Sequence, residues 1–219
     1  MTIQINYAKD RSPYYSVLSD GKFHTEAPEG AEGSVKREYE TSDGKKGVKN
    51  EFIAESIEGK MISLDVHEGE YGKMVQVTLG DLKEKVIISL NSASSFGEDF
   101  MKKLPLIKVE KEIKLVPYSF EDELGKKRKG ITIYQDGEKV QSNYGSKVGE
   151  KYVVTNGYPA IPEGSDKFDT DDWKMYFMTA RKFLLVETSK HSLYGAIAKE
   201  ADKEMDYPEN EVDPKDIPF

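Results

Sequence analysis

The chain has 219 residues, of which 33% are charged and 37% are hydrophobic, and its formal net charge is −8. This length allows one sizeable core with appendages or two small domains. Cysteine is absent, which excludes disulfides, thiol nucleophiles and cysteine-based zinc sites. No apolar run approaches the roughly 20 residues that span a bilayer, and the first residues lack the pattern of a secretory signal, so we expect a cytoplasmic protein.

The negative charge is unevenly distributed along the chain. Residues 202–219 hold seven acids and two lysines, a net charge of −5, so the other 201 residues carry −3. Those residues contain two basic clusters: Lys36, Arg37, Lys45, Lys46 and Lys49, and then Lys126, Lys127, Arg128 and Lys129. Because the distribution of charge decides which surface attracts a polyanion, the negative total does not exclude nucleic acid as a partner.

Residues 1–33 are loop-like, since SDG at 19–21 and PEGAEG at 28–33 are turn sequences. We expect them to form an N-terminal arm, either flexible or packed on the core. A β pattern begins at Val35, with a hairpin that leads into a long strand in which Ile62, Leu64 and Val66 alternate with polar residues. Residues 73–79 and 85–90 alternate in the same way and predict two more strands.

The hydrophobic period changes after these three strands. Ser95 and Glu98 form a capping-box pattern, and the short helix that follows should end at Pro105. Residues 111–120 predict a fourth strand, which should lie at a sheet edge or bulge because it contains Pro117. A loop over residues 121–130 and a fifth strand over residues 131–135 complete this region.

Three strands, a short helix and two further strands match the order of an OB-fold, a small and partly open Greek-key barrel. We therefore predict a mainly β protein with a five-stranded OB-fold barrel within residues 34–160, extended by turns and short β pieces after residue 137.

Residues 161–201 should form a helical C-terminal extension, with one helix over 169–188 and a weaker one over 193–205. The apolar stripe of the first helix, headed by Trp173, is interpreted as packing on the barrel or on another subunit. The acidic tail 202–219 is expected to be disordered.

The basic loop between the fourth and fifth strands lies where an OB-fold grips a strand of nucleic acid, although a solvated hairpin tip has the same composition. Aromatic rings on which any base can stack would complete such a surface, although each ring could instead pack on a neighbouring segment. The candidate nucleic-acid-binding residues are Arg37, Tyr39, Lys45, Lys46, Lys49, Tyr71, Lys73, Lys85, Tyr118, Phe120, Lys126, Lys127, Arg128, Lys129 and Tyr134.

No motif in the sequence favours catalysis. The aspartates within residues 166–172 resemble a helix N-terminus more than a metal site. His24, His67 and His191 show no ligand spacing, and neither a Walker-type phosphate loop nor a GxSxG nucleophile motif occurs. We expect no catalytic residue, no metal and no cofactor.

The chain ends in Asp-Ile-Pro-Phe at residues 216–219. This ending resembles the tip of bacterial single-stranded DNA-binding proteins, a run of aspartates followed by Ile-Pro-Phe, although Lys215 stands where that family usually has an aspartate. Together with the OB-like strand order, the whole chain resembles the single-stranded DNA-binding proteins of bacteriophages. The resemblance implies that the tip enters an apolar pocket with a basic rim on a partner protein, through Asp213, Asp216, Ile217, Pro218 and Phe219.

These features lead us to expect a non-enzymatic protein that coats single-stranded DNA during phage DNA replication, recombination and repair in the bacterial host cytoplasm. It would recruit phage or host proteins through its tip, and a homo-oligomer is compatible with this role. Three alternatives remain open: an RNA-binding OB protein, a virion or assembly protein that uses its barrel as a structural module, and a metal-dependent nuclease.

Overall fold

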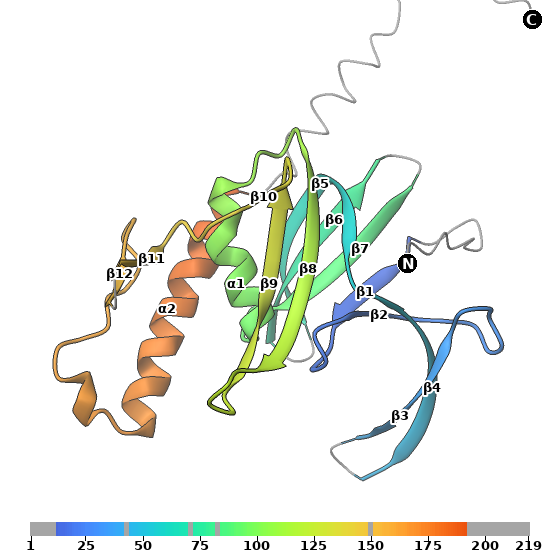
Figure 1. Cartoon of the computed structure of the whole chain (residues 1–219), viewed down its shortest axis with the longest axis horizontal. Coiled ribbons are helices and arrows are strands. Elements are labelled where there is room, and N and C mark those ends of the chain that lie inside the picture. The colour runs from blue at the N-terminus through green and yellow to red at the C-terminus, as the bar shows by residue number, and fades with distance from the viewer. Residues whose placement is uncertain (1–11, 42–43, 70–71, 82–83, 149–150, 192–219) are drawn as a thin grey trace, which may run out of the picture.

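The structure, a computed structural model, describes residues 12–41, 44–69, 72–81, 84–148 and 151–191. Strands dominate it, which confirms the expected mainly β class (Figure 1). The main sheet has the order β10-β9-β8-β5-β6-β7-β1-β2-β4-β3. Its strands are β1 (Tyr14–Val17), β2 (Phe23–Glu26), β3 (Val35–Glu40), β4 (Lys46–Ala54), β5 (Ile57–Gly69), β6 (Gly72–Gly80), β7 (Lys85–Asn91), β8 (Glu112–Glu121), β9 (Lys127–Gln135) and β10 (Glu138–Lys139).

The body of the molecule is the antiparallel run β9-β8-β5-β6-β7, whose five strands lie where the sequence predicts strands. Within it, β8-β5-β6-β7 is the Greek-key order, in which the fourth strand returns to lie beside the first. The two ends of β5 serve different partners, since residues 57–60 pair with β8 and residues 61–69 pair with β6. A register shift between Met61 and Ser63 marks the change, and such a bulge bends a strand.

Helix α1 (Ser95–Lys103) connects β7 to β8 and packs against both β7 and β9. Its side chains Phe100 and Met101 are fully buried in the core. The edge of β7 that does not pair with β6 pairs in parallel with β1, and the described residues contain no ladder between β7 and β9. The sheet is therefore open between β7 and β9, and α1 covers the opening.

The N-terminal segment corrects one expectation from the sequence. Residues 14–26 are not a loop-like arm, because β1 pairs with β7 and β2 pairs with both β1 and β4. Phe23 is completely buried, so this segment is packed on the core. Together β2, β4 and β3 form a wing that projects from the body in Figure 1.

Three local expectations can be compared with the structure. The cap of α1 is Ser94, whose Oγ accepts from the Gly97 N–H, and not Ser95. Strand β9 begins at Lys127 and not at residue 131, so the preceding turn is shorter than predicted. Pro117 pairs with Ile131 of β9 and lies beyond Leu115, the last residue of β8 that pairs with β5, so it lies where β8 has a ladder on one side only within the described residues.

Helix α2 (Thr170–Lys190) begins at a capping box between Asp169 and Asp172, as the acids there predict. It buries Ala180 and Leu184 and packs on α1 and β5, while Phe177 of the predicted apolar stripe is 48% exposed. The short strands β11 (Gly145–Val148) and β12 (Lys151–Val154) form a separate hairpin. The predicted helix over 193–205, the tail 202–219 and residues 1–11 lie outside the described residues.

Candidate nucleic-acid interface

Strands β8 and β9 present one face to the core and the other to the outside. Ile113, Leu115, Ile131 and Ile133 point inward and are buried. The alternate positions point outward, and cross-strand register pairs them as Lys114 with Tyr134, Val116 with Thr132, Tyr118 with Gly130 and Phe120 with Arg128. This outward row, here called the β8–β9 face, is about 20 Å long at the usual strand rise. It brings together the predicted residues Tyr118, Phe120, Arg128 and Tyr134.

The aromatic pair on the β8–β9 face consists of Tyr118 and Phe120. Their ring centroids lie 5.8 Å apart at 37°, and Phe120 is 56% exposed. Tyr118 lies over Gly130, where an added Cβ would come within 2.4 Å of the tyrosine oxygen. Burial, and then the charge of Asp99, raises the pKa of Tyr118. Tyr118 is thus the supporting ring, and Phe120 offers the accessible surface.

Tyr134 lies at the other end of the same face. The Lys139 ammonium lies 6.0 Å from the centroid of its ring. Beside it is a surface depression lined by two lysines, three acids, Tyr134 and Gly137: Glu58, Lys111, Glu112, Lys114 and Asp136. Lys111 forms an ion pair with Asp136, so this end of the face carries charges of both signs.

The turn between β8 and β9, residues 122–126, is held by one carboxylate. Asp122 Oδ1 accepts from the backbone N–H groups of Leu124 and Lys126, and its Oδ2 accepts from Arg128 Nε at 2.8 Å. The Lys126 N–H group, followed by Arg128, lowers the pKa of Asp122. Gly125 has a φ of 72°, and Leu124 at the tip is 91% exposed.

The cations of this hairpin are therefore not equivalent. Arg128 is paired with Asp122, whereas Lys126, Lys127 and Lys129 form no ion pair within the described residues. Lys126 and Lys127 are exposed and Lys129 is half-buried. Because side chains alternate along a strand, Lys127 and Lys129 point to the opposite side from Arg128. The predicted basic loop becomes a short turn followed by three cations on a strand.

The β3–β4 hairpin holds the first basic cluster on the wing. Tyr39 covers Gly47, where an added Cβ would lie 2.6 Å from the ring, and Lys49 Nζ lies 5.4 Å from the ring centroid. Arg37 donates to both oxygens of Glu51 at 2.7 Å. Lys46 lies 3.7 Å from Glu40, and Lys45 is exposed. The aromatic ring and the arginine of this cluster are engaged within the wing.

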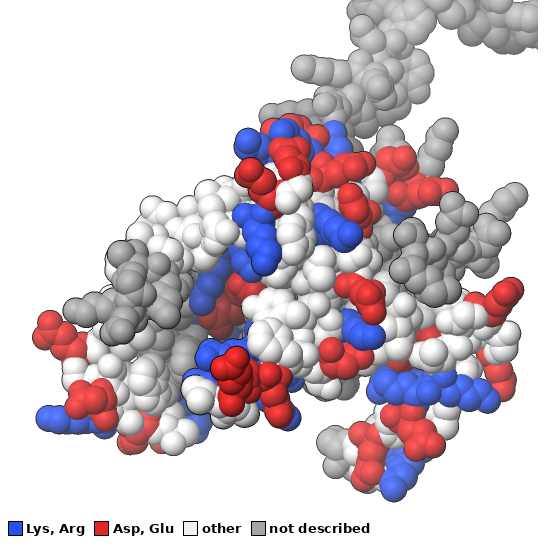
Figure 2. All heavy atoms as spheres, viewed as in Figure 1, with Lys and Arg blue, Asp and Glu red and all other residues white. Residues whose placement is uncertain are grey.

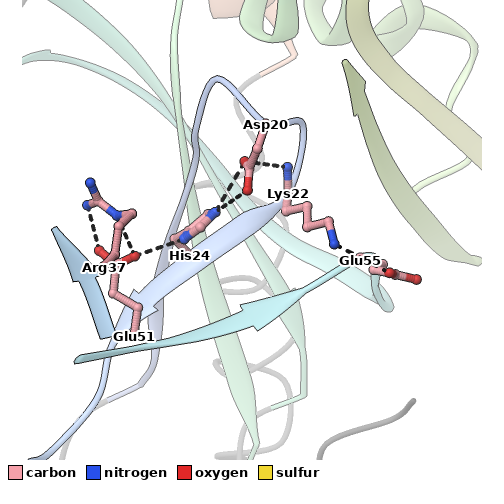
Figure 3. Close-up of polar contacts among 6 residues, drawn as sticks. All are labelled: Asp20, Lys22, His24, Arg37, Glu51 and Glu55. Atoms are coloured by element: carbon pink, nitrogen blue, oxygen red, sulfur yellow. Dashed lines mark hydrogen bonds and ion pairs between the residues drawn. The ribbon is translucent and has the colours of Figure 1, made fainter. Parts of the chain in front are cut away.

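A buried polar network secures that arginine (Figure 3). His24 is 4% exposed, and its Nδ1 lies 2.9 Å from Glu51 while its Nε2 lies 3.0 Å from Asp20. His24 therefore lies between two carboxylates, and each of its ring nitrogens contacts one of them. Hydrogen bonds from Arg37 and, to a lesser degree, His24 lower the pKa of the buried Glu51 carboxyl, while burial opposes them. The network ties β2, β3 and β4 together.

In the order of the sheet, six strands separate the two basic clusters, because β8, β5, β6, β7, β1 and β2 lie between β9 and β4. The sheet curls, however, so that the β1–β2 turn approaches β8: a Cβ added to Gly21 would lie 2.4 Å from the backbone nitrogen of Ser119. Figure 2 shows lysine and arginine mixed with acids on this side of the molecule, without one continuous basic patch. Lys73 lies opposite Glu68 at the start of β6, and Lys85 begins β7; both are exposed. Tyr71 and the tip residues Asp213, Asp216, Ile217, Pro218 and Phe219 lie outside the described residues.

Sequence reasoning missed Lys114 and Leu124. The alternation of EIKLVPYSFE places Lys114 on the same face as Tyr118 and Phe120, and this signal was available in the sequence. No sequence pattern indicated that Leu124 is exposed, because its place at the tip depends on the exact bounds of the turn.

Comparisons with protein-family models, with curated proteins and with solved structures found no match. In the described part of the chain, no group of three or more His, Cys, Asp or Glu side chains is arranged so that it could hold a metal ion. No helix among these residues has the length and apolar character needed to cross a membrane.

Proposed function

We propose that the chain is a non-enzymatic single-stranded DNA-binding protein that coats exposed strands during phage DNA replication and recombination. The observation that carries the proposal is the β8–β9 face, where the rings of Tyr118, Phe120 and Tyr134 lie on the same side of two paired strands as the cations Lys114 and Arg128. Stacking on such rings is tolerant of sequence, since every base has a flat face, and lysines beside them neutralise phosphates.

The strand order supports the proposal. The order β9-β8-β5-β6-β7, with α1 between β7 and β8, is the one expected of an OB-fold, and we propose that this body is an OB-type barrel completed by α1. In such folds the loops after the first and fourth strands flank the bound strand. The turn at residues 122–126 would be the second of these loops, and Asp122 accepts two of its backbone N–H groups.

Fluorescence titration of the full chain with dT oligonucleotides of several lengths tests this proposal. Trp173 and the tyrosines supply the signal, and we expect saturable quenching that weakens with salt. Equal affinity for RNA of matching sequence would favour an RNA-binding protein instead. No binding at low salt would favour a virion or assembly role, and magnesium-dependent loss of a labelled strand would reveal a nuclease.

We further propose that the Asp216–Phe219 tip recruits replication or repair proteins, on the strength of its sequence. Deleting Phe219 removes the apolar anchor and leaves every acid in place, so affinity for DNA should stay the same. Binding of a purified replication or repair protein to the DNA-bound chain should fall. Unchanged binding of every partner tested would refute the recruitment role without affecting the DNA-binding proposal.

A further inference from the structure

Helix α2 has an apolar side that the rest of the described chain leaves uncovered. Its inner side buries Ala180, Leu184 and Thr188 against α1 and β5. On the opposite side Met175 is 69% exposed and Met178 is 65% exposed. Exposed apolar residues on one helix side mark an interaction surface when they are contiguous.

The spacing of these residues defines a seam along α2. Its positions alternate by four and three residues, which keeps them on one side of a helix: Asp171, Met175, Met178, Lys182, Leu185 and Ser189. The spacing reads the same in both directions. An antiparallel second copy of the helix, related by a two-fold axis near residue 180, therefore places Met175 against the edge of Leu185, which is half-buried and also packs against the core, and Met178 against Lys182. The lysine stem can cover the methionine while its ammonium stays in water.

The charges on α2 select the same arrangement. Its first turns, residues 169–175, carry three aspartates and one lysine, a net charge of −2. Its second half, residues 181–190, carries three cations and one glutamate, a net charge of +2. Antiparallel pairing brings each acidic half against a basic half and also opposes the helix dipoles, whereas parallel pairing brings like charges together. The local pairs Lys174–Asp171 and Lys190–Glu187 are exposed and can exchange partners readily.

We propose that α2 is the contact surface for a second copy of this chain, in an antiparallel two-fold dimer centred near residue 180. The interface is isologous, because the same side of the same helix serves both copies. The surface lies on α2, and the β8–β9 face lies on different elements, so the dimer would carry two such faces.

Cysteine cross-linking tests the geometry directly, because the natural chain has no cysteine. A mixture of Met178→Cys and Lys182→Cys chains should form a disulfide under mild oxidation, since these two positions face each other beside the two-fold axis. Met175→Cys should not link to itself, but a mixture of Met175→Cys and Leu185→Cys chains should link to each other. Linking of Met175→Cys to itself, without linking in the mixture, would indicate a parallel contact and overturn the proposal.

Light scattering after size-exclusion chromatography tests the surface itself. We expect the full chain at micromolar concentration to have twice the 24.8 kDa chain mass, and the double variant Met175→Glu, Met178→Glu to have the single mass. Val48→Glu is the matched control, because Val48 is 58% exposed on the wing, and it should stay dimeric. A monomeric natural chain, or a double variant that stays dimeric with an unchanged thermal midpoint, would overturn the proposal.

Discussion

The β3–β4 and β8–β9 hairpins have similar compositions and use them differently. Each combines aromatic rings with several cations, yet in β3–β4 the arginine binds the buried Glu51 and Tyr39 covers a glycine. In β8–β9 the exposed Phe120 and three lysines have no such engagement within the described residues. The contrast teaches that the cations of a basic cluster stay available to a partner only where no neighbouring strand supplies a buried acid.

The largest expected effect is a loss of stability when the buried network of the β3–β4 hairpin is disrupted. Glu51→Gln leaves Arg37 and the buried His24 without their shared carboxylate. Removing one partner of a buried ion pair costs about 3–5 kcal/mol, so the free energy of unfolding should fall by that amount. Urea unfolding at neutral pH measures it. Glu40→Gln, which affects only the exposed pair with Lys46, is the control and should cost less than about 1 kcal/mol.

Acid should destabilise the natural chain in the same way as Glu51→Gln does, because it neutralises the same carboxylate. The pKa of Glu51 is lower in the folded state, so its stabilising contribution is present above the ordinary carboxyl pKa and is lost as pH falls through the folded value. Thermal midpoints should therefore drop between about pH 5 and pH 3 in the natural chain. In Glu51→Gln the drop should be smaller. Equal drops in both chains would assign the acid sensitivity to other carboxyls.

A smaller effect concerns the rings. Phe120→Ala and Tyr118→Ala should each weaken binding to a dT oligonucleotide by roughly 1–3 kcal/mol if bases stack on them. Tyr39→Ala should leave affinity unchanged, because that ring lies over Gly47 on the wing. Fluorescence titration gives the affinities. A loss of affinity for Tyr39→Ala alone would move the proposed interface from the β8–β9 face to the wing.

The lysines give a more specific test through salt. Replacing Lys114, on the β8–β9 face, and Lys126, in the turn, with glutamine should reduce the slope of log K against log salt by about 1.4, at roughly 0.7 per phosphate contact on a single strand. Arg37→Gln should not change that slope. An unchanged slope in the double variant would remove the β8–β9 hairpin from the phosphate path.

The sequence predicted those parts of the molecule whose signals are local. Alternation along the chain placed β5 to β9, and Pro117 identified a strand edge. The four-residue strand β1 was missed, because it is too short for a period to show and its parallel partner β7 lies about 70 residues away. The engagement of Arg37 by Glu51 was missed for another reason: the sequence predicted a hairpin here, but only the exact register of β3 against β4 brings these two side chains together.

The smallest expected effect is a change in the salt dependence of binding, and a matched pair of substitutions, one in each hairpin, shows which hairpin contacts the nucleic acid. Asp122→Asn and Glu51→Gln each remove one negative charge and each release an arginine, Arg128 in the first case and Arg37 in the second. Asparagine can keep the two backbone bonds to Oδ1, so the turn should still form, while Oδ2 is replaced by an amide donor that cannot accept from Arg128. A released Arg128 should add about one phosphate contact and steepen the salt slope by roughly 0.7. Glu51→Gln raises the net charge equally, so an effect of total charge alone would steepen both slopes by the same amount. Steepening in Asp122→Asn alone would locate the nucleic acid on the β8–β9 hairpin, and steepening in Glu51→Gln alone would contradict that assignment.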